Sequence, residues 1–156
     1  KPGGEVRLKN AYFIKCTGYE TDENGNVTLV KAEYDPASRG GESPDGRKVK
    51  GTIHWVSAKH AINAEVRLYD MLFKVENPED VPEGGDYKDN LNPDSLIVLH
   101  DSKVEPILKD AKPGDKFQFL RMGYFCVDSR DSSPGALVFN KTVGLKDTWA
   151  KIANKI

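Results

Sequence analysis

The feature that most constrains the fold is the close spacing of turn signals. Gly, Pro, Asn and Asp interrupt the chain about every ten residues, and the runs between them are short and either apolar or alternating. The strongest of these signals is Asn24-Gly25, a dipeptide typical of tight hairpin turns. The pattern predicts roughly nine short strands, and therefore an all-β sandwich or barrel, or two of them.

The predicted strands alternate with polar loops along the chain. They are expected at 6–16, 27–34, 53–57, 62–69, 95–100, 116–122, 123–128 and 136–143. Residues 70–73 are expected to form a turn or a short extended continuation of the strand at 62–69. Breakers crowd residues 77–93, which predicts an ordered or half-ordered connector with at most one helical turn near Tyr87. This connector is the best candidate boundary, and it divides the chain into 1–76 and 77–156. Residues 145–156 lack Pro and fit a short terminal helix.

The charge of the chain is dense but balanced. Its 156 residues include 23 Lys and Arg and 24 Asp and Glu, for a net charge of −1. This argues against a protein coated with basic charge but leaves room for a local basic face that binds nucleic acid. No apolar run approaches the roughly 18 residues of a membrane helix. No apolar run follows the first residues either, so the start is expected to be a boundary within a longer sequence and not a secretory signal.

The cysteines and histidines argue against a metal site. Cys16 and Cys126 lie far apart in aromatic or β-branched runs, which favours two buried free thiols, with a disulfide as the alternative. The three histidines have no metal-ligand spacing with cysteine or with one another. The pair His54-Trp55, inside an apolar run, is more typical of a core than of a stacking platform.

Catalytic motifs are absent from the sequence. The pairs Gly40-Gly41 and Gly84-Gly85 lack the lysine or the strand–helix context of phosphate-binding and dinucleotide-binding loops. Carboxylate pairs such as Glu79-Asp80 are expected by chance when 30% of the residues are charged. The chain by itself therefore lacks the features of an enzyme.

The residue types support RNA binding better. Single-stranded RNA is recognised by cations on phosphates, aromatic rings on unstacked bases, and amide or guanidinium groups on base edges. The alternation at 117–121 places Gln118 opposite the Phe side chains, with Arg121 near the strand end. Gln118 and Arg121 are therefore candidate base contacts, and the alternative is that both are ordinary solvated strand residues.

Two further basic groups are candidates for RNA contacts. Arg7 and Lys9 share one face of the first predicted strand, where the alternative role is to protect an edge strand from aggregation. Arg47, Lys48 and Lys50 are candidate phosphate contacts, or else a basic loop that guards the apolar strand after it.

Six blocks of the sequence resemble a known family. In order they are VRLKNAYFIKC, YDPASRGG, DGRKVKGTIHWVSAKHA, EVRLYDMLF, KFQFLRMGYFCVDS and VFNKTVGLKDTWAK, which extend over nearly the whole chain. They are similar to the C-terminal anticodon-binding region of glutaminyl-tRNA synthetases. The signatures of that family's catalytic half, of the His-Ile-Gly-His and Lys-Met-Ser-Lys types, do not occur in these residues.

The resemblance implies an all-β fold of two antiparallel β-barrels, shared with a ribosomal 5S-RNA-binding protein, and a short C-terminal helix. Residues 1–76 would form mainly the distal barrel and residues 77–156 mainly the proximal one. The resemblance also implies a cytoplasmic, monomeric glutamine–tRNA ligase whose ATP and Mg²⁺ sites lie in a catalytic domain outside this chain. This chain alone is then expected to be inactive and to hold no cofactor. Its expected partners are the anticodon stem-loop of tRNA(Gln) and that catalytic domain, with no membrane.

The resemblance also assigns roles to site residues. In the family, the Gln and Arg of a Phe-Gln-Phe-Glu-Arg block recognise the central uridine of the anticodon, and they match Gln118 and Arg121. Leu120 stands where the family has an acid, and so removes a carboxylate able to orient the arginine. Arg7 matches a residue at the first anticodon base. Lys9, in a neighbouring role, replaces a family Arg and loses its bidentate geometry.

Two alternatives remain open from the sequence. One is the same region of a β-barrel-type glutamyl-tRNA synthetase, and the other is a non-catalytic β-barrel interaction domain, which a net charge of −1 also suits. The anticodon that the isolated chain prefers distinguishes the glutamyl type from the glutaminyl type. A strong salt dependence of RNA binding argues against the interaction domain.

Overall fold

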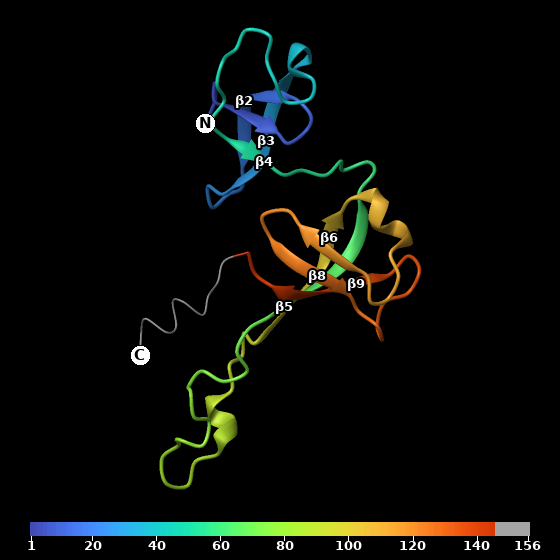
Figure 1. The fold of residues 1–156 in the computed structure, drawn as a ribbon. Coiled ribbons are helices and arrows are strands. Elements are labelled where there is room, and N and C mark those ends of the chain that lie inside the picture. Colours follow the sequence, from blue (N-terminus) through green and yellow to red (C-terminus); the bar gives the residue numbers. More distant parts are fainter. Residues whose placement is uncertain (146–156) are drawn as a thin grey trace. The chain divides into compact units, whose positions relative to one another are not determined.

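The computed structural model describes residues 1–145, and the statements below refer to this part of the chain. Two compact units are present, unit 1 at Lys1–Trp55 and unit 2 from Val56 onward. Each unit is built on its own sheet (Figure 1). The sequence-based division between residues 76 and 77 separates two predicted barrels. The two units are defined differently, by which residues contact one another, and they do not test that division, which stays a prediction.

Unit 1 is a four-stranded mixed sheet in the order β3-β2-β1-β4 (Figure 1). Its elements are β1 (Glu5–Leu8), β2 (Phe13–Thr21), β3 (Val27–Asp35), the short 3-10 helix η1 (Pro36–Ser38) and β4 (Thr52–Ile53). β2 pairs antiparallel with both β1 and β3, whereas β4 lies parallel to β1. The parallel pair arises because the long loop after η1 returns the chain to the side of β1 in the same direction.

The strand predicted at 6–16 is split in two by a tight turn. The amide of Ala11 donates to the carbonyl oxygen of Leu8 at 3.0 Å, and Asn10 has a φ of 58°. Asn tolerates this left-handed conformation because its short polar side chain forms local hydrogen bonds. The prediction missed the turn because neither Gly nor Pro marks it.

The hairpin predicted at Asn24-Gly25 is confirmed. The amide of Asp22 donates to the carbonyl oxygen of Asn26 at 2.9 Å, and Gly25 has a φ of 81°. A carboxylate oxygen of Asp22 also accepts hydrogen bonds from the amides of Asn24 and Asn26, at 2.9 and 2.8 Å. β2 and β3 therefore pair directly from the turn, beginning at Thr21 and Val27, with a shift in register between Thr21 and Glu20.

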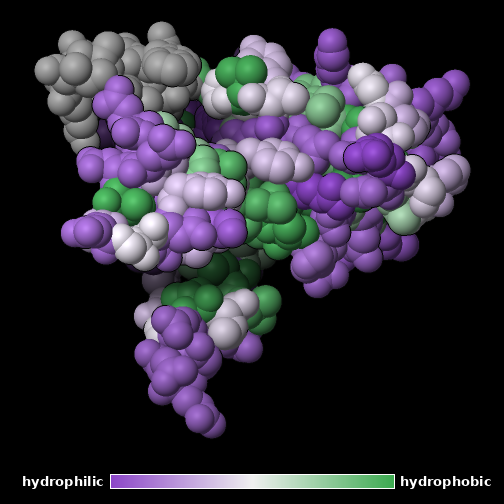
Figure 2. Space-filling model, turned by 90° about the horizontal axis from the view of Figure 1, so that it is seen from below, coloured by the Kyte–Doolittle hydropathy of each residue, from purple (hydrophilic) through white to green (hydrophobic). Residues whose placement is uncertain are grey.

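Unit 1 leaves much of its apolar surface exposed. The side chains of Val27, Leu29, Val30 and Tyr34 on the edge strand β3 are 49–61% exposed. Seen from below, the surface of the molecule also carries hydrophobic residues, in green, among polar ones (Figure 2). A four-stranded sheet of this size has few side chains with which to cover both of its faces.

Unit 2 is a five-stranded mixed sheet in the order β6-β5-β9-β8-β7 (Figure 1). Its elements are β5 (Ile62–Tyr69), the 3-10 helix η2 (Tyr87–Asn90), β6 (Leu96–Val104), the 3-10 helix η3 (Pro106–Asp110), β7 (Lys116–Phe119), β8 (Gly123–Val127) and β9 (Leu137–Val143). β5 and β9 are parallel, and the other neighbours are antiparallel.

The core of unit 2 lies on one face of this sheet. Its buried side chains are Ala64, Val66, Val104, Leu108, Phe125, Val127, Leu137 and Phe139, with Phe117 and Phe119 packed against them. Along β8, Phe125 and Val127 are 2% and 1% exposed, whereas Tyr124 is exposed. Because side chains alternate along a strand, the other face of the sheet carries mainly polar and exposed residues, and the buried Val138 is an exception.

Residues 70–95 form an arm that extends from the ends of β5 and β6 (Figure 1). The amide of Asp70 donates to the carbonyl oxygen of Ser95 at 2.9 Å, and the amide of Asn92 donates to that of Leu72 at 2.8 Å. η2 is the helical turn of this arm. The predicted connector with at most one helical turn near Tyr87 is therefore confirmed.

The all-β class is confirmed, but the predicted closed barrels are not found in residues 1–145. Each sheet is open and mixed, with β3 and β4 at the edges of one and β6 and β7 at the edges of the other. The described residues contain no α-helix, and none of their helices is long and apolar enough to cross a membrane. Apart from Leu145, the predicted terminal helix lies outside the described residues.

Candidate nucleic-acid interface

The predicted first-base residue Arg7 lies on β1 and is held by contacts on two sides of its chain. Its guanidinium carbon lies 5.0 Å from the centre of the Phe13 ring. Its aliphatic part lies against Gly41, where a Cβ atom would come within 3.2 Å of Arg7 Cδ and where φ is +90°. The half-buried side chain of Arg7 is therefore restrained by the fold before any RNA binds.

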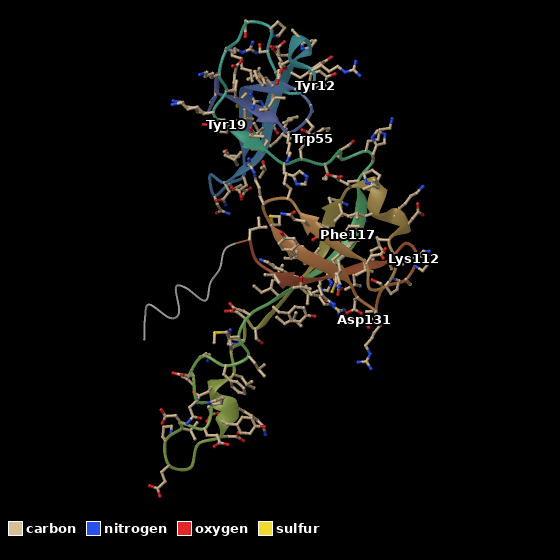
Figure 3. The ribbon with its side chains drawn as sticks, viewed as in Figure 1. Tyr12, Tyr19, Trp55, Lys112, Phe117 and Asp131 are labelled. Carbon is tan, nitrogen blue, oxygen red and sulfur yellow. The ribbon has the colours of Figure 1, made fainter. Side chains whose placement is uncertain are left out.

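Lys9 follows β1 directly and is tied to the chain beyond the long loop. Its amide donates to the carbonyl oxygen of Ile53 at 3.0 Å, and its own carbonyl oxygen accepts a hydrogen bond from Nε1 of Trp55 at 3.1 Å. Trp55 is 43% exposed and is labelled in Figure 3. The predicted burial of His54-Trp55 is therefore wrong, because only Thr52–Ile53 of that apolar run forms a strand.

Arg47, the first of the three predicted phosphate contacts, is surrounded by acids. It forms ion pairs with Glu5 at 3.2 Å and with Asp35 and Asp45 at 2.5 Å each. Its hydrogen bonds to Asp35 and Asp45 raise the pKa of Arg47. Hydrogen bonds from the Ser43 hydroxyl and from Arg47 lower the pKa of Asp45 to about 2. The guanidinium is thus occupied by carboxylates, and it braces the loop against the sheet.

Lys48 and Lys50 differ from Arg47, although they lie in the same loop. Both are exposed. Neither ammonium group forms an ion pair with any residue that the structure describes. A phosphate group can therefore reach these two lysines without displacing an acid.

The predicted central-base residues lie together on the β7–β8 hairpin of unit 2. Phe117 (Figure 3) and Phe119 pack against the core, so Gln118 between them faces away and is exposed. Arg121 lies in the turn with a φ of 64°, and the amide of Met122 donates to the carbonyl oxygen of Phe119 at 2.9 Å. Gln118 points outward as predicted. The strand predicted at 116–122 ends three residues earlier, at Phe119, because the turn begins there.

A polar network that the sequence analysis did not identify lies on the same outer face of unit 2. Arg67 of β5 forms ion pairs with Glu65 at 2.7 Å and with Asp131 (Figure 3) at 2.6 Å. The side-chain amide of Asn140 donates to Asp128 at 2.6 Å, and Asp128 lies 3.8 Å from Arg67. The alternation of β5 was visible in the sequence, but Asp131 is 64 residues away from Arg67 and no local pattern joins them.

Asp128 gives this network a pH dependence. Hydrogen bonds from the Asp131 amide, the Asn140 side chain and the Arg130 amide lower the pKa of Asp128 from 3.8 to about 2. Because its pKa is lower in the folded state, this carboxylate stabilises the fold above about pH 4, and the contribution is lost as the pH falls toward about 2. The side chain is 14% exposed, so we expect a contribution of about 1–2 kcal/mol.

Urea unfolding of wild type and Asp128→Asn at about pH 5 and about pH 2 measures this contribution. We expect the variant to be less stable at the higher pH and the difference to shrink at the lower one. Asp110→Asn, at a side chain that is 83% exposed, is the control and should change little at either pH. A difference between wild type and Asp128→Asn that is the same at both pH values would contradict the assignment.

The predicted contacts thus fall into two sets. Arg7, Lys9 and the loop cations belong to unit 1, whereas Gln118 and Arg121 belong to unit 2. Within the described residues, Cys16 and Cys126 are free and no cluster of His, Cys, Asp or Glu is suited to a metal ion. Chemically, the two sets offer cations for phosphates and an amide and a guanidinium for base edges.

Two protein-family models match the chain, over residues 1–35 and 52–128. Both describe the anticodon-binding domain of class I tRNA synthetases of the E and Q type. The matched ranges hold most of the chain, including Arg7 and Lys9 in the first and Gln118 and Arg121 in the second. The chain therefore belongs to the anticodon-binding domains of class I tRNA synthetases.

Curated relatives narrow the class to the glutaminyl type. The chain is 51% identical over 150 residues to the glutamine–tRNA ligase of Stutzerimonas stutzeri, with 96% of this chain and 27% of that protein covered. It is 52% identical over 150 residues to that of Azotobacter vinelandii, with 96% and 27% covered, and 52% identical over 155 residues to that of Rhodopirellula baltica, with 99% and 26% covered. The family resemblance is confirmed: the chain is an anticodon-binding region of the glutaminyl-tRNA synthetase type, and it spans about a quarter of the length of these relatives.

Proposed function

We propose that the chain recognises the anticodon stem-loop of tRNA(Gln), with Gln118 and Arg121 at the central uridine. The β7–β8 hairpin is the observation that carries this proposal. Core aromatic residues fix one face of β7, and the exposed amide of Gln118 lies on the other, followed by Arg121 in the turn. An amide both donates and accepts, and a guanidinium donates, which suits the carbonyl and N–H groups on the edge of uracil.

Arg7 and Lys9 serve the first anticodon base in this proposal. The contacts of Arg7 with Phe13 and Gly41 support it, since a restrained side chain loses less freedom on binding. We assign phosphate contacts to Lys48 and Lys50. For Arg47 we favour bracing of the loop that carries them, because its guanidinium already pairs with acids.

We also propose that the whole protein is a cytoplasmic, monomeric ligase that joins glutamine to tRNA(Gln) with ATP and Mg²⁺. The support is the similarity to glutamine–tRNA ligases, of which this chain spans 27% of the length or less. ATP, Mg²⁺ and glutamine would bind in a catalytic domain outside these residues, which is then a partner of this region within one protein. The chain alone is expected to bind RNA without ligating it.

Arg121→Ala should abolish discrimination between a glutamine anticodon stem-loop and the same loop with cytidine at the central position. One good base-edge contact is worth about 1–3 kcal/mol, or roughly 5- to 150-fold in affinity. Fluorescence anisotropy at about 50 and 200 mM salt measures both loops. Lys48→Ala is the control, which should weaken both loops equally and reduce the salt dependence.

The other outcomes identify the alternatives. Equal binding of both loops by the wild type, driven only by salt, would place base recognition outside this chain. Preference for a glutamate anticodon would contradict the proposed specificity for tRNA(Gln). No binding even at low salt would show that this region does not hold the stem-loop by itself.

A further inference from the structure

We propose that Tyr124 is the stacking surface for the central anticodon base and is thus a further RNA-binding residue beside Gln118 and Arg121. This inference rests on the proposed function and adds a residue to the same site. The ligand it requires is the planar face of an unpaired pyrimidine base.

The strand register places Tyr124 next to the proposed base contact. Gln118 and Tyr124 are direct partners in the antiparallel β7–β8 pair. Side chains at such positions lie on the same face, with Cβ atoms about 4.5–5.5 Å apart. Phe119 and Phe125, their neighbours in the chain, lie on the core face. The amide and the phenol ring are therefore adjacent on the outer face.

The ring of Tyr124 is accessible, and its backbone is fixed. Tyr124 is 46% exposed. Its carbonyl oxygen accepts a hydrogen bond from the Thr142 hydroxyl at 3.0 Å. The preceding Gly123 is buried so closely that a Cβ atom there would lie 2.6 Å from the carbonyl oxygen of Val143. The strand cannot shift easily, so the ring keeps its place beside Gln118.

Neither an aromatic pair nor a side-chain hydrogen bond within the described residues accounts for an aromatic side chain at this position. Within residues 1–145 the Tyr124 ring pairs with no other aromatic ring, and its hydroxyl forms no hydrogen bond. By contrast, the hydroxyl of the exposed Tyr69 donates to Asn140 at 3.0 Å. An exposed ring without such a partner is available to a base.

Stacking and edge recognition complement each other chemically. A base taken out of the loop stack loses contacts on its faces, which an aromatic side chain restores. A base that lies on the Tyr124 ring presents its edge to the neighbouring groups, where Gln118 and Arg121 supply donors and acceptors. Stacking alone tolerates every base, so Tyr124 contributes affinity and the other two contribute selectivity.

Dihydrouridine at the central position separates the two contributions. It keeps the carbonyl and N–H groups of the uracil edge, but its saturated ring is puckered and stacks poorly. For the wild-type 156-residue chain, we expect the dihydrouridine loop to bind about 5- to 150-fold more weakly than the uridine loop, the range of base–aromatic stacking. Tyr124→Leu should bind the uridine loop more weakly by a similar factor and should no longer distinguish the two loops.

Three further variants control this test. Tyr124→Phe keeps the ring and should bind within about twofold of the wild type, because stacking does not need the hydroxyl. Tyr19→Leu, at a tyrosine of unit 1 that is 53% exposed, should leave binding unchanged. Arg121→Ala should lose the preference for uridine over cytidine and still bind dihydrouridine more weakly than uridine.

The failure of this inference is distinguishable from the failure of the proposed function. If the wild type prefers uridine to cytidine and Tyr124→Leu binds the uridine loop as tightly as the wild type, stacking on Tyr124 is refuted and the proposed function stands. If the wild type binds uridine and cytidine loops equally, edge recognition by Gln118 and Arg121 is refuted. Stacking on Tyr124 is then refuted as well only if the wild type also binds the dihydrouridine loop as tightly as the uridine loop.

Discussion

Replacing Phe13 with alanine should remove most of the stability of unit 1 while unit 2 stays folded. Among residues 1–55, Phe13 is the only buried hydrophobic side chain, at 1% exposed. Its amide donates to the Ser38 hydroxyl at 2.8 Å, and the guanidinium groups of Arg7 and Arg47 lie 5.0 and 5.2 Å from its ring centre. The substitution therefore removes the group around which unit 1 is assembled.

The expected size of this effect follows from the volume lost. A buried Phe→Ala change costs about 3–5 kcal/mol. Small domains have about 0.05–0.15 kcal/mol of stability per residue, which gives a unit of this length roughly 3–8 kcal/mol. Unit 2 keeps its own core around Phe139, which is 0% exposed, so we expect it to keep its fold.

Amide hydrogen exchange measures the two units separately. In Phe13→Ala, amides of β1, β2 and β3 should lose protection, whereas those of β5, β8 and β9 should keep it. Leu29→Ala, at a side chain that is 49% exposed, is the control and should change protection little. Equal loss of protection in both sheets would show that the units do not unfold separately, and unchanged protection in β1–β3 would show that Phe13 is dispensable.

Local patterns predicted much of the fold, and the reasons are physical. Asn24-Gly25 located its hairpin because Gly25 adopts a positive φ at no steric cost. The alternation at Ile62–Tyr69 located β5 because one of its faces is buried. The parallel pairs β1–β4 and β5–β9 could not be predicted in this way, because they join segments far apart in the chain. The two barrels were predicted from the family resemblance. Local patterns alone left a sandwich or a barrel open, because they do not distinguish a closed sheet from an open one.

The candidate site shows the same limit. The outward direction of Gln118 follows from the alternating Phe residues on either side, so the sequence sufficed. Arg47 was expected to meet phosphates because it lies in a basic run. Its acidic partner Glu5 is 42 residues away, so no local pattern could indicate this ion pair. Trp55 was expected in a core because its neighbours are apolar, but only two residues of that run form a strand.

Replacing Gly123 with alanine should destabilise unit 2 by about 3 kcal/mol or more and abolish recognition of the central uridine. Gly123 has a φ of 141° and joins the Arg121 turn to β8. A Cβ atom here would lie 2.6 Å from the carbonyl oxygen of Val143 and 3.1 Å from Cε of Lys141. The carbonyl oxygen of Val143 belongs to the backbone of β9, so β8 has to move away from it to admit the methyl group. The strain of a positive φ at alanine adds to the loss of stability.

Gly114→Ala is the matched control, because it introduces backbone strain without a steric clash. Gly114 precedes β7, and Gly123 follows the turn at the other end of the same strand. Gly114 has a φ of 89°, but no heavy atom lies within 4 Å of a Cβ placed there. We expect it to cost only the strain of a left-handed residue, about 1–2 kcal/mol, and to keep the preference for uridine over cytidine. Urea unfolding and stem-loop binding of both variants measure the two effects. If both variants lose the same stability and both keep the preference, the close contact with β9 does not position Arg121, and the hairpin owes its geometry to the core aromatic residues alone.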